Sequence, residues 1–382
     1  MQPDDRRLAA RWTRREFVRG AAGMVALPRL PLGAVAAPAP QFAYVASGEG
    51  SLHVFRLRGE VWTTTQRVPS PAPACILLSP AQRTLYVANE VDVHEGLPRG
   101  TVEAFHVDPF DGSLTLLGRT PLSLSATHPR HLALSPDGKM LAVAAYGGAI
   151  YNLFPIGEDG SLGQPSGIFK QAGCGPHPRS QASAHPHTLL FDPGGGHLLS
   201  SDFGSDRLSV FAVKGGRLEG RMQRATGEGS GPSACALHPA GSFFYAWHDL
   251  ESTLVCYHYD GEAGAMGDTI QRLSFPAASR HALALHPSGL MLYTTQENRN
   301  ELRAWHVDAK NGRLTHAKVV LLGEATPTQI AASPDGEGIF VLDGPAGSIC
   351  KVTADRATGE LHCKANVAVV NEPKSIALKT VS

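Results

Sequence analysis

One stretch of the chain, residues 175–211, gathers four histidines, two arginines and three aspartates around two apolar runs. His185 and His187 come directly before the first run, and Asp202 and Asp206 follow the second. In an antiparallel pair, the start of one strand lies at the same edge as the end of the next strand. We therefore expect these four side chains to share one edge of a sheet, where polar groups gathered together form a candidate site.

Imidazole and carboxylate groups in such a cluster can take a proton from water and return it, because imidazole titrates near neutral pH. A simpler interpretation is structural, since Asp and Gly are also the normal residues of tight turns. A metal site is a weaker alternative, because His185-Pro-His187 offers only two ligands and no HExxH pattern exists. We predict no metal ion and no cofactor.

The elements that would position this cluster are repeated along the chain. An apolar strand, a turn related to x-Pro-x-Gly and a second apolar strand recur six times. The turn prolines stand 46 to 57 residues apart, at Pro80, Pro136, Pro193, Pro239, Pro287 and Pro334. Such turns are typical of β-hairpins. A second turn, as in Asp111-Gly-Ser-Leu114, follows the third strand of most units and leads to a fourth strand. We therefore predict that each unit is a four-stranded antiparallel sheet.

The two ends of the chain complete one further sheet. Residues 42–57 contain two strands without an innermost partner, and Ser375–Leu378 is a single apolar strand near the C-terminus. Six full units and this shared unit predict an all-β, seven-bladed β-propeller whose ring is closed by strands from both ends. The two longest intervals between turns place their extra residues in loops, at 91–99 and 173–184.

One face of such a ring should collect titratable residues. In each blade the start of the innermost strand and the end of the second strand lie on the same face near the axis, and loops on such scaffolds carry function. The residues at these positions are Glu49, Glu90, Arg130, His131, Tyr146, His185, His187, Asp202, Ser233, His248, Asp249, Arg280, His281, Glu297, Thr328, Asp343 and Lys374. Histidines of the turn motif, such as His238 and His286, fall on the opposite edge and are interpreted as structural.

The composition argues against several classes of partner. The 34 Lys plus Arg residues balance 34 Asp plus Glu residues, so no basic excess indicates nucleic-acid binding. No apolar run is long enough for a transmembrane helix. Glycine and proline are abundant, at 41 and 28, while 42% of the residues are hydrophobic, which fits many tight turns in a folded domain. We expect a monomer.

The N-terminus carries the pattern of an export signal. Thr13–Arg19 reads TRREFVR, a twin-arginine motif, and a moderately apolar region follows it. Ala34–Ala36 forms an A-x-A cleavage pattern. We predict a cleaved signal of residues 1–36, a mature propeller of residues 37–382, a periplasmic or secreted location, and no stable membrane insertion after cleavage.

Six cysteines are spread over the chain without a CxxC pair, which argues against a zinc knuckle. Cys350 and Cys363 flank a predicted hairpin, and they face each other if Val352 faces Leu361. A disulfide could then form in an oxidising periplasm. Two buried thiols are the alternative that we favour, and a twin-arginine substrate, which folds before transport, should not depend on a disulfide.

These features together resemble the seven-bladed lactonase family, which includes propeller-type 6-phosphogluconolactonases and carboxy-muconate lactonizing enzymes. The resemblance runs from about Phe42 to the C-terminus. Its marks are Tyr146-Gly-Gly, Glu158-Asp-Gly-Ser-Leu-Gly163, Pro178-Arg-Ser-Gln181, His185-Pro-His187, Asp202-Phe-Gly-Ser-Asp-Arg207, Gly229-Ser-Gly-Pro232 and His238-Pro-Ala-Gly241. Together these motifs are specific, whereas a single Ser-Pro-Asp-Gly turn occurs in many propellers.

The resemblance implies hydrolysis of a lactone, which needs a base to activate water and a donor to stabilise the oxyanion. It suggests His187 as the base, with Asp202 or Asp249 to orient it. Guanidinium groups pair with carboxylates and phosphates, so the expected substrate contacts combine arginines with polar neighbours. They are Arg130, His131, Tyr146, Arg179, His185, Asp206, Arg207, Arg280 and Glu297.

Three arginines that family members carry on this face are absent. Members commonly read Gly-Pro-Arg-His, Asn-Arg-Gly and Pro-Arg where this chain has Gly231-Pro-Ser-Ala234, Gln296-Glu-Asn298 and Pro327-Thr328. A glutamate of the family also stands here as Asp249. A phosphorylated sugar lactone is therefore a doubtful substrate.

Two functions remain in competition. The first, which we favour, is an exported hydrolase of a small-molecule lactone or a related sugar-derived ligand. The second is a non-catalytic periplasmic propeller that binds a small ligand or a protein partner, and the missing arginines motivate it. An isomerising lactonase of the muconate type ranks lower, because it needs the same missing positions.

Overall fold

Tight turns join the two inner strands of the repeats. In one of them the amide of Gly138 donates to the carbonyl of Ser135, and Gly138 has a φ of +69°, a region that favours glycine. Pro136 fixes the backbone of the first turn residue. The ring of Pro80 lies 3.4 Å from the position that a Cβ on Gly138 would take. The turn of one sheet therefore packs on the turn of the next.

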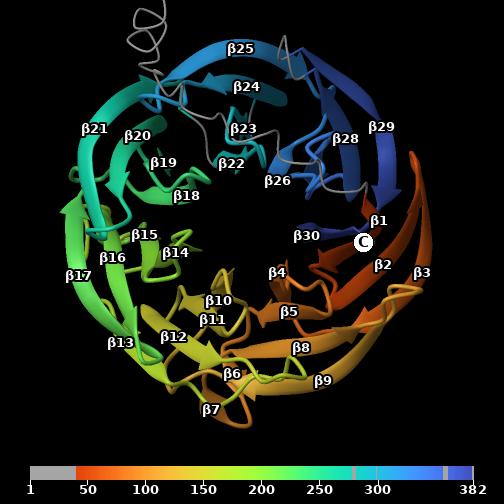
Figure 1. Cartoon of the computed structure of the whole chain (residues 1–382), viewed down its shortest axis with the longest axis horizontal. Helices are drawn as coiled ribbons and strands as arrows, with labels where there is room; N and C mark the ends of the chain where they lie inside the picture. Colours follow the sequence, from red (N-terminus) through yellow and green to blue (C-terminus); the bar gives the residue numbers. More distant parts are fainter. Residues whose placement is uncertain (1–39, 278–280, 298, 356–359, 381–382) are drawn as a thin grey trace, which may run out of the picture. The chain divides into compact units, whose positions relative to one another are not determined.

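The computed structural model describes residues 40–277, 281–297, 299–355 and 360–380, which form seven four-stranded antiparallel sheets around a central axis (Figure 1). This confirms the predicted seven-bladed propeller. From the innermost strand outward, the sheets are β30 (Pro373–Thr380), β1 (Pro40–Ser47), β2 (Ser51–Arg58) and β3 (Val61–Pro69); β4 (Pro73–Leu78), β5 (Thr84–Asn89), β8 (Thr101–Val107) and β9 (Leu114–Pro121); β10 (Pro129–Leu134), β11 (Met140–Ala145), β12 (Ile150–Pro155) and β13 (Gly167–Lys170); β14 (Pro186–Phe191), β15 (His197–Asp202), β16 (Arg207–Lys214) and β17 (Arg217–Ala225); β18 (Pro232–Leu237), β19 (Phe243–His248), β20 (Thr253–Asp260) and β21 (Ala265–Ser274); β22 (His281–Leu285), β23 (Met291–Gln296), β24 (Glu301–Val307) and β25 (Leu314–Leu321); and β26 (Pro327–Ala332), β27 (Ile339–Asp343), β28 (Ser348–Ala354) and β29 (Leu361–Val369). A small hairpin of β6 (Val93–His94) and β7 (Leu97–Pro98) lies in the loop after β5.

Strands from both ends of the described chain share one sheet, as predicted. β30 pairs antiparallel with β1, with Ala43 opposite Leu378 and Val45 opposite Ile376. One detail differs, because the N-terminal region supplies three strands and the sequence predicted two within residues 42–57. The third strand, β3, consists of exposed and half-buried residues, so it lacks the apolar run that would mark it in the sequence.

The core lies between neighbouring sheets. The inner strands are buried on both faces, and all six residues of β5 and of β19 are buried. The outer strands, such as β17, alternate between half-buried and exposed residues. One core cluster joins Tyr86 and Val102 of one sheet to Leu132 and Val143 of the next. This packing fixes the inner strand ends, which a site at the axis requires.

Cys350 and Cys363 occupy neighbouring strands in a register that differs from the one considered above. Val352 lies opposite Cys363, and Cys350 lies opposite Asn366, with irregular pairing between them. Both cysteines are free, and Cys350 is buried whereas Cys363 is exposed, so the expectation of two buried thiols is wrong for Cys363. Burial, and then the nearness of Cys363, raises the pKa of the Cys350 thiol to about 12.

Two sequence predictions concern residues that the structure does not describe. The export signal, residues 1–36, and the predicted substrate contact Arg280 both lie outside the described ranges. Within those ranges, no helix has the length and hydropathy of a membrane span.

Candidate functional site

A cavity of about 500 Å³ lies at the centre of the ring. All seven blades line it, and most of the lining residues stand at or near the start of an innermost strand or the end of a second strand, the positions to which the sequence rule pointed. The lining residues are Ala74, Glu90, Arg130, His131, Tyr146, His187, Thr188, Phe203, Ala234, Cys235, Asp249, His281, Leu283, Thr328, Gln329 and Lys374. In the part of the chain that the structure describes, no three His, Cys, Asp or Glu side chains cluster as a metal centre requires.

Tyr146, directly after β11, carries a stack of side chains on one side of this cavity. The guanidinium carbon of Arg130 lies 4.0 Å from the Tyr146 ring centroid, and the His185 ring stacks on the same tyrosine at 4.4 Å. His187 approaches the tyrosine edge-on, with the ring centroids 6.5 Å apart. The Nε of Arg130 donates to Oε1 of Glu90 at 2.5 Å. Three neighbouring blades therefore contribute to one ordered cluster.

Asp202, the last residue of β15, holds the backbone before β14. Its Oδ1 accepts hydrogen bonds from the amides of His185 at 2.8 Å and of Gly204 and Ser205 at 3.0 Å. Its Oδ2 is buried and has no hydrogen-bond partner among the described residues. Burial raises the pKa of the Asp202 carboxyl, because the charged form loses hydration. These hydrogen bonds hold the backbone of His185, whereas the sequence predicted this carboxylate beside His187.

Glycines after β11 and β15 allow the ends of these strands to approach the loops that precede the innermost strands β10 and β14. A Cβ on Gly204 would stand 1.9 Å from the carbonyl oxygen of Ser183, and a Cβ on Gly148 would stand 1.9 Å from that of Ser125. Any side chain at these positions would displace the backbone. The glycines of the Tyr146-Gly-Gly and Asp202-Phe-Gly motifs therefore let the turns after β11 and β15 lie against the loops that precede β10 and β14.

His131 and His187 come from the neighbouring innermost strands β10 and β14. The amide of Leu189 donates to Nδ1 of His131 at 3.3 Å. Burial, and then the charge of His187, lowers the pKa of His131 to about 4, so His131 is neutral at neutral pH. The half-buried His187 has its Nδ1 3.3 Å from Oγ1 of Thr188. Of these two imidazoles, His187 is the better candidate for a base.

Asp249 and His281 form a pair across the boundary between two blades. Nδ1 of His281 lies 2.8 Å from Oδ1 of Asp249, and its Nε2 lies 3.3 Å from Nε2 of Gln296. The His281 ring also stacks on Trp247 at 4.2 Å. Both ring nitrogens are therefore engaged within the cavity wall. The sequence predicted Asp249 beside His187, and its pairing with His281 was not predicted.

Asp206, a predicted substrate contact, lies in a connection between loops. Its Oδ1 accepts from Nε2 of Gln181 at 2.6 Å and from the amide of Gly231 at 2.8 Å, and its Oδ2 accepts from the amide of Gly229 at 2.7 Å. Asp206 is not one of the described residues that line the central cavity. Asp206 therefore joins the loop 173–184 to the loop before β18.

The other predicted contacts are distributed around the site. Arg207 donates from Nη1 to Oε1 of Gln223 at 3.1 Å, on the outer strands of its blade. Arg179 is exposed in the loop 173–184. Glu297 lines a second, smaller cavity beside the central one. Of the residues expected to bind or react, Arg130, His131, Tyr146, His187 and Asp249 line the central cavity, and His185 stacks behind Tyr146.

Part of the cavity wall is apolar and was not predicted from the sequence; it includes Phe203, Cys235 and Leu283. Phe203 directly follows Asp202 at the end of a second strand, so the same rule could have selected it. Burial raises the pKa of the Cys235 thiol to about 12, which keeps it protonated and unreactive.

Comparisons with known proteins agree with this architecture. The family described as "Lactonase, 7-bladed beta-propeller" matches residues 43–378. The chain is similar to the 6-phosphogluconolactonase of Bacillus subtilis, with 26% identity over 223 residues, and to that of Pectobacterium carotovorum, with 30% identity over 234 residues. These alignments cover 58% and 59% of this chain, and they span only 62% and 63% of the two relatives.

Among solved structures, the fold resembles the periplasmic gluconolactonase of Pseudomonas aeruginosa, with a TM-score of 0.79. The superposition covers 89% of this chain and 99% of that protein, at 24% identity. At that level of identity the likeness concerns the fold.

Proposed function

Because the chain belongs to the seven-bladed β-propeller lactonase family, we propose that it hydrolyses a small-molecule lactone in the central cavity. The relatives named above are 6-phosphogluconolactonases and a gluconolactonase, which favours a sugar-derived lactone. The observation that carries the proposal is the cluster of His187, Tyr146 and Arg130. It combines a cavity-lining imidazole with a guanidinium held at 4.0 Å over the same tyrosine ring.

In the proposed reaction His187 accepts a proton from a water molecule. The resulting hydroxide adds to the carbonyl carbon of the lactone, and the carbonyl oxygen becomes negatively charged. Arg130 stabilises this oxyanion, since a guanidinium presents five N–H donors and the contact with Glu90 uses the one on Nε. The ring carbon–oxygen bond then breaks, and the proton returns from His187 to the alkoxide that leaves.

Asp249 is the second ionisable group that takes part in the proposed reaction. Its side chain is 14% exposed and is oriented by the fully buried His281. A fixed carboxylate in the cavity wall can accept a hydrogen bond from the attacking water or from a substrate hydroxyl. It thereby orients the reacting molecule relative to His187.

We propose in addition that the protein is exported. The support is the twin-arginine pattern of Thr13–Arg19 and the A-x-A pattern of Ala34–Ala36. The periplasmic location of the Pseudomonas relative agrees with this proposal. Replacing Arg14 and Arg15 by lysine should retain the protein in the cytoplasm, which cell fractionation would detect.

Hydrolysis measured as proton release tests the catalytic proposal. We expect the purified protein to turn over gluconolactone or another small lactone, and His187→Ala to lower kcat/KM by about 10² to 10⁴-fold. His106→Ala, a substitution of an exposed histidine on β8, is the matched control and should leave the rate unchanged. Saturable binding of lactones without turnover would instead support a non-catalytic binding propeller.

A further inference from the structure

A second cavity, of about 350 Å³, adjoins the central one. Thr328 and Lys374 line both cavities, so the two spaces share part of their walls. The remaining lining residues of the second cavity are Glu297, Gly344, Pro345, Glu372 and Pro373. We call this second cavity the side chamber. It is built from three neighbouring blades, those that contain β22, β26 and β30.

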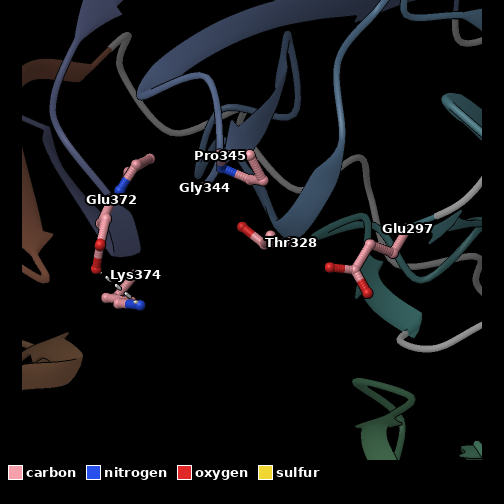
Figure 2. A pocket seen from close by; sticks show the side chains of 7 residues that line it. Glu297, Thr328, Gly344, Pro345, Glu372 and Lys374 are labelled. Carbon is pink, nitrogen blue, oxygen red and sulfur yellow. Dashed lines mark ion pairs between the residues drawn. The ribbon is translucent and has the colours of Figure 1, made fainter.

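The polar groups of the side chamber face one another across Thr328. Figure 2 shows Glu297 on one side of Thr328 and the pair of Glu372 and Lys374 on the other. Nζ of Lys374 lies 3.4 Å from Oε2 of Glu372. The hydroxyl of Thr328 donates to the carbonyl of Leu342 at 3.1 Å, which leaves its oxygen lone pairs to accept a hydrogen bond.

The ion pair lies against the backbone at Gly48, and its side chains are 49% (Lys374) and 63% (Glu372) exposed. A Cβ on Gly48 would stand 2.2 Å from Oε2 of Glu372 and 2.8 Å from Cε of Lys374. The amide of Gly48 also donates to the carbonyl of Glu372 at 2.9 Å. Both side chains therefore lie across a glycine of the neighbouring strand end, and any larger residue there would displace them.

We infer that the side chamber binds the end of the substrate remote from the lactone carbonyl, and that it selects an uncharged tail bearing hydroxyl groups. This inference rests on the proposed hydrolysis in the central cavity. Hydroxyl groups donate to the carboxylates of Glu297 and Glu372, and they accept from the ammonium of Lys374. A tail with several hydroxyls thus finds both kinds of partner.

Charge disfavours a phosphorylated tail in the same place. In the described lining of the side chamber the one ammonium, that of Lys374, is paired with Glu372 at 3.4 Å, so a phosphate dianion would have to displace a carboxylate from its cation. Within the described lining of the central cavity, the cations are Arg130 and Lys374, and each has a carboxylate neighbour, Glu90 or Glu372. A phosphate would have to compete with these carboxylates for its cation.

Binding of non-hydrolysable lactams tests the inference without requiring turnover. The probes are gluconolactam, its 6-phosphate and xylonolactam, which lacks the terminal hydroxymethyl group, each titrated calorimetrically into the full chain. We expect gluconolactam to bind about tenfold more tightly than either of the other two, which corresponds to one hydrogen bond to a charged group or one unfavourable charge contact. Preference for the phosphate, or equal affinity for gluconolactam and xylonolactam, would overturn the inference.

Two variants assign the selectivity to the side chamber. Glu297→Gln should reduce the preference of gluconolactam over its phosphate by about fivefold to tenfold, because one negative charge is removed. Thr328→Val should reduce the preference over xylonolactam, and Glu219→Gln, an exposed outer-strand change, should alter neither. Selectivity unchanged in both chamber variants would overturn the assignment. Loss of lactone turnover together with normal lactam selectivity would contradict only the proposed hydrolysis.

Discussion

Nδ1 of His281 and Oδ1 of Asp249 lie 2.8 Å apart across the boundary between two blades. The histidine side chain is fully buried, and the aspartate reaches the central cavity. The stacking of His281 on Trp247 at 4.2 Å fixes the ring plane. The carboxylate at the cavity wall is therefore positioned by a neighbouring blade.

Removing this support should weaken the site without removing the carboxylate. We expect His281→Ala to lower kcat/KM by about tenfold or more, because Asp249 loses a charge-assisted hydrogen bond and its fixed orientation. His281→Asn, whose amide can still donate toward Asp249, should recover part of the loss. Rates measured as proton release with both variants would check this, and equal rates for the Ala and Asn variants would contradict the positioning role.

The ring of Tyr146 should matter more than its hydroxyl. Tyr146→Phe keeps the aromatic ring that Arg130 and His185 contact, and we expect kcat/KM within about threefold of the unmodified protein. Tyr146→Leu removes the aromatic stacking, worth about 1–2 kcal/mol for the cation contact alone, and should lower kcat/KM by about tenfold or more. Thermal unfolding of both variants would separate a local effect from a loss of folding.

Buried neutral histidines should make the protein sensitive to acid. Burial lowers the pKa of His131 to about 4, and burial, followed by the charge of Arg272, lowers that of His248 to about 3. Both values lie below the ordinary value near 6.5, so the unfolded chain binds protons first as the pH falls. Above pH 6.5 these histidines do not lower the free energy of unfolding. As the pH falls from 6.5 to the pKa values of the folded state, the free energy of unfolding decreases.

This loss has a measurable slope. Each histidine should reduce the free energy of unfolding by about 1.4 kcal/mol per pH unit within its window. Urea unfolding at a series of pH values should show His131→Gln with a shallower pH dependence between pH 6.5 and about 4. An unchanged slope in that variant would mean that His131 can take up a proton in the folded state.

The loop connection made by Asp206 should contribute to stability. Asp206→Asn places an amide N–H₂ group where the carboxylate now accepts from Gln181, Gly229 and Gly231. We expect a loss of about 2–4 kcal/mol in the free energy of unfolding, because buried donors lose an acceptor. Asp268→Asn, an exposed change on β21, should stay within about 0.5 kcal/mol, and a similarly small effect of Asp206→Asn would contradict the structural role.

The repeats allowed the architecture to be predicted, whereas the pairing of individual side chains could not be predicted from the sequence. The Pro-Gly turns and the apolar inner strands depend on local sequence, so seven blades and their closure followed from them. β3 was missed because an exposed outer strand has no apolar run. The partner of Asp249 was missed because two strand ends are brought together by the angle between blades, which no sequence spacing contains.

The rule that the start of an innermost strand and the end of the second strand share one face succeeded for a related reason. It needs only the order of strands within a blade, so it selected Arg130, His131, Tyr146 and His187 correctly as neighbours of the axis. It could not separate Asp202, whose carboxylate turns toward backbone amides, from residues that face the cavity. Side-chain direction at a strand end depends on the following turn, and there the buried carboxylate binds its own loop.

Because Ala43 pairs with Leu378, the ring cannot close until the last strand has been synthesised. During translation β1 leaves the ribosome 335 residues before its inner neighbour, the difference between positions 378 and 43. Until then its inner edge presents unpaired amides and carbonyls, which can recruit strands of other chains. A product that terminates before β30 would be an open ring in which the inner edge of β1 is unpaired. We expect such a product to aggregate through this edge, in addition to lacking one strand.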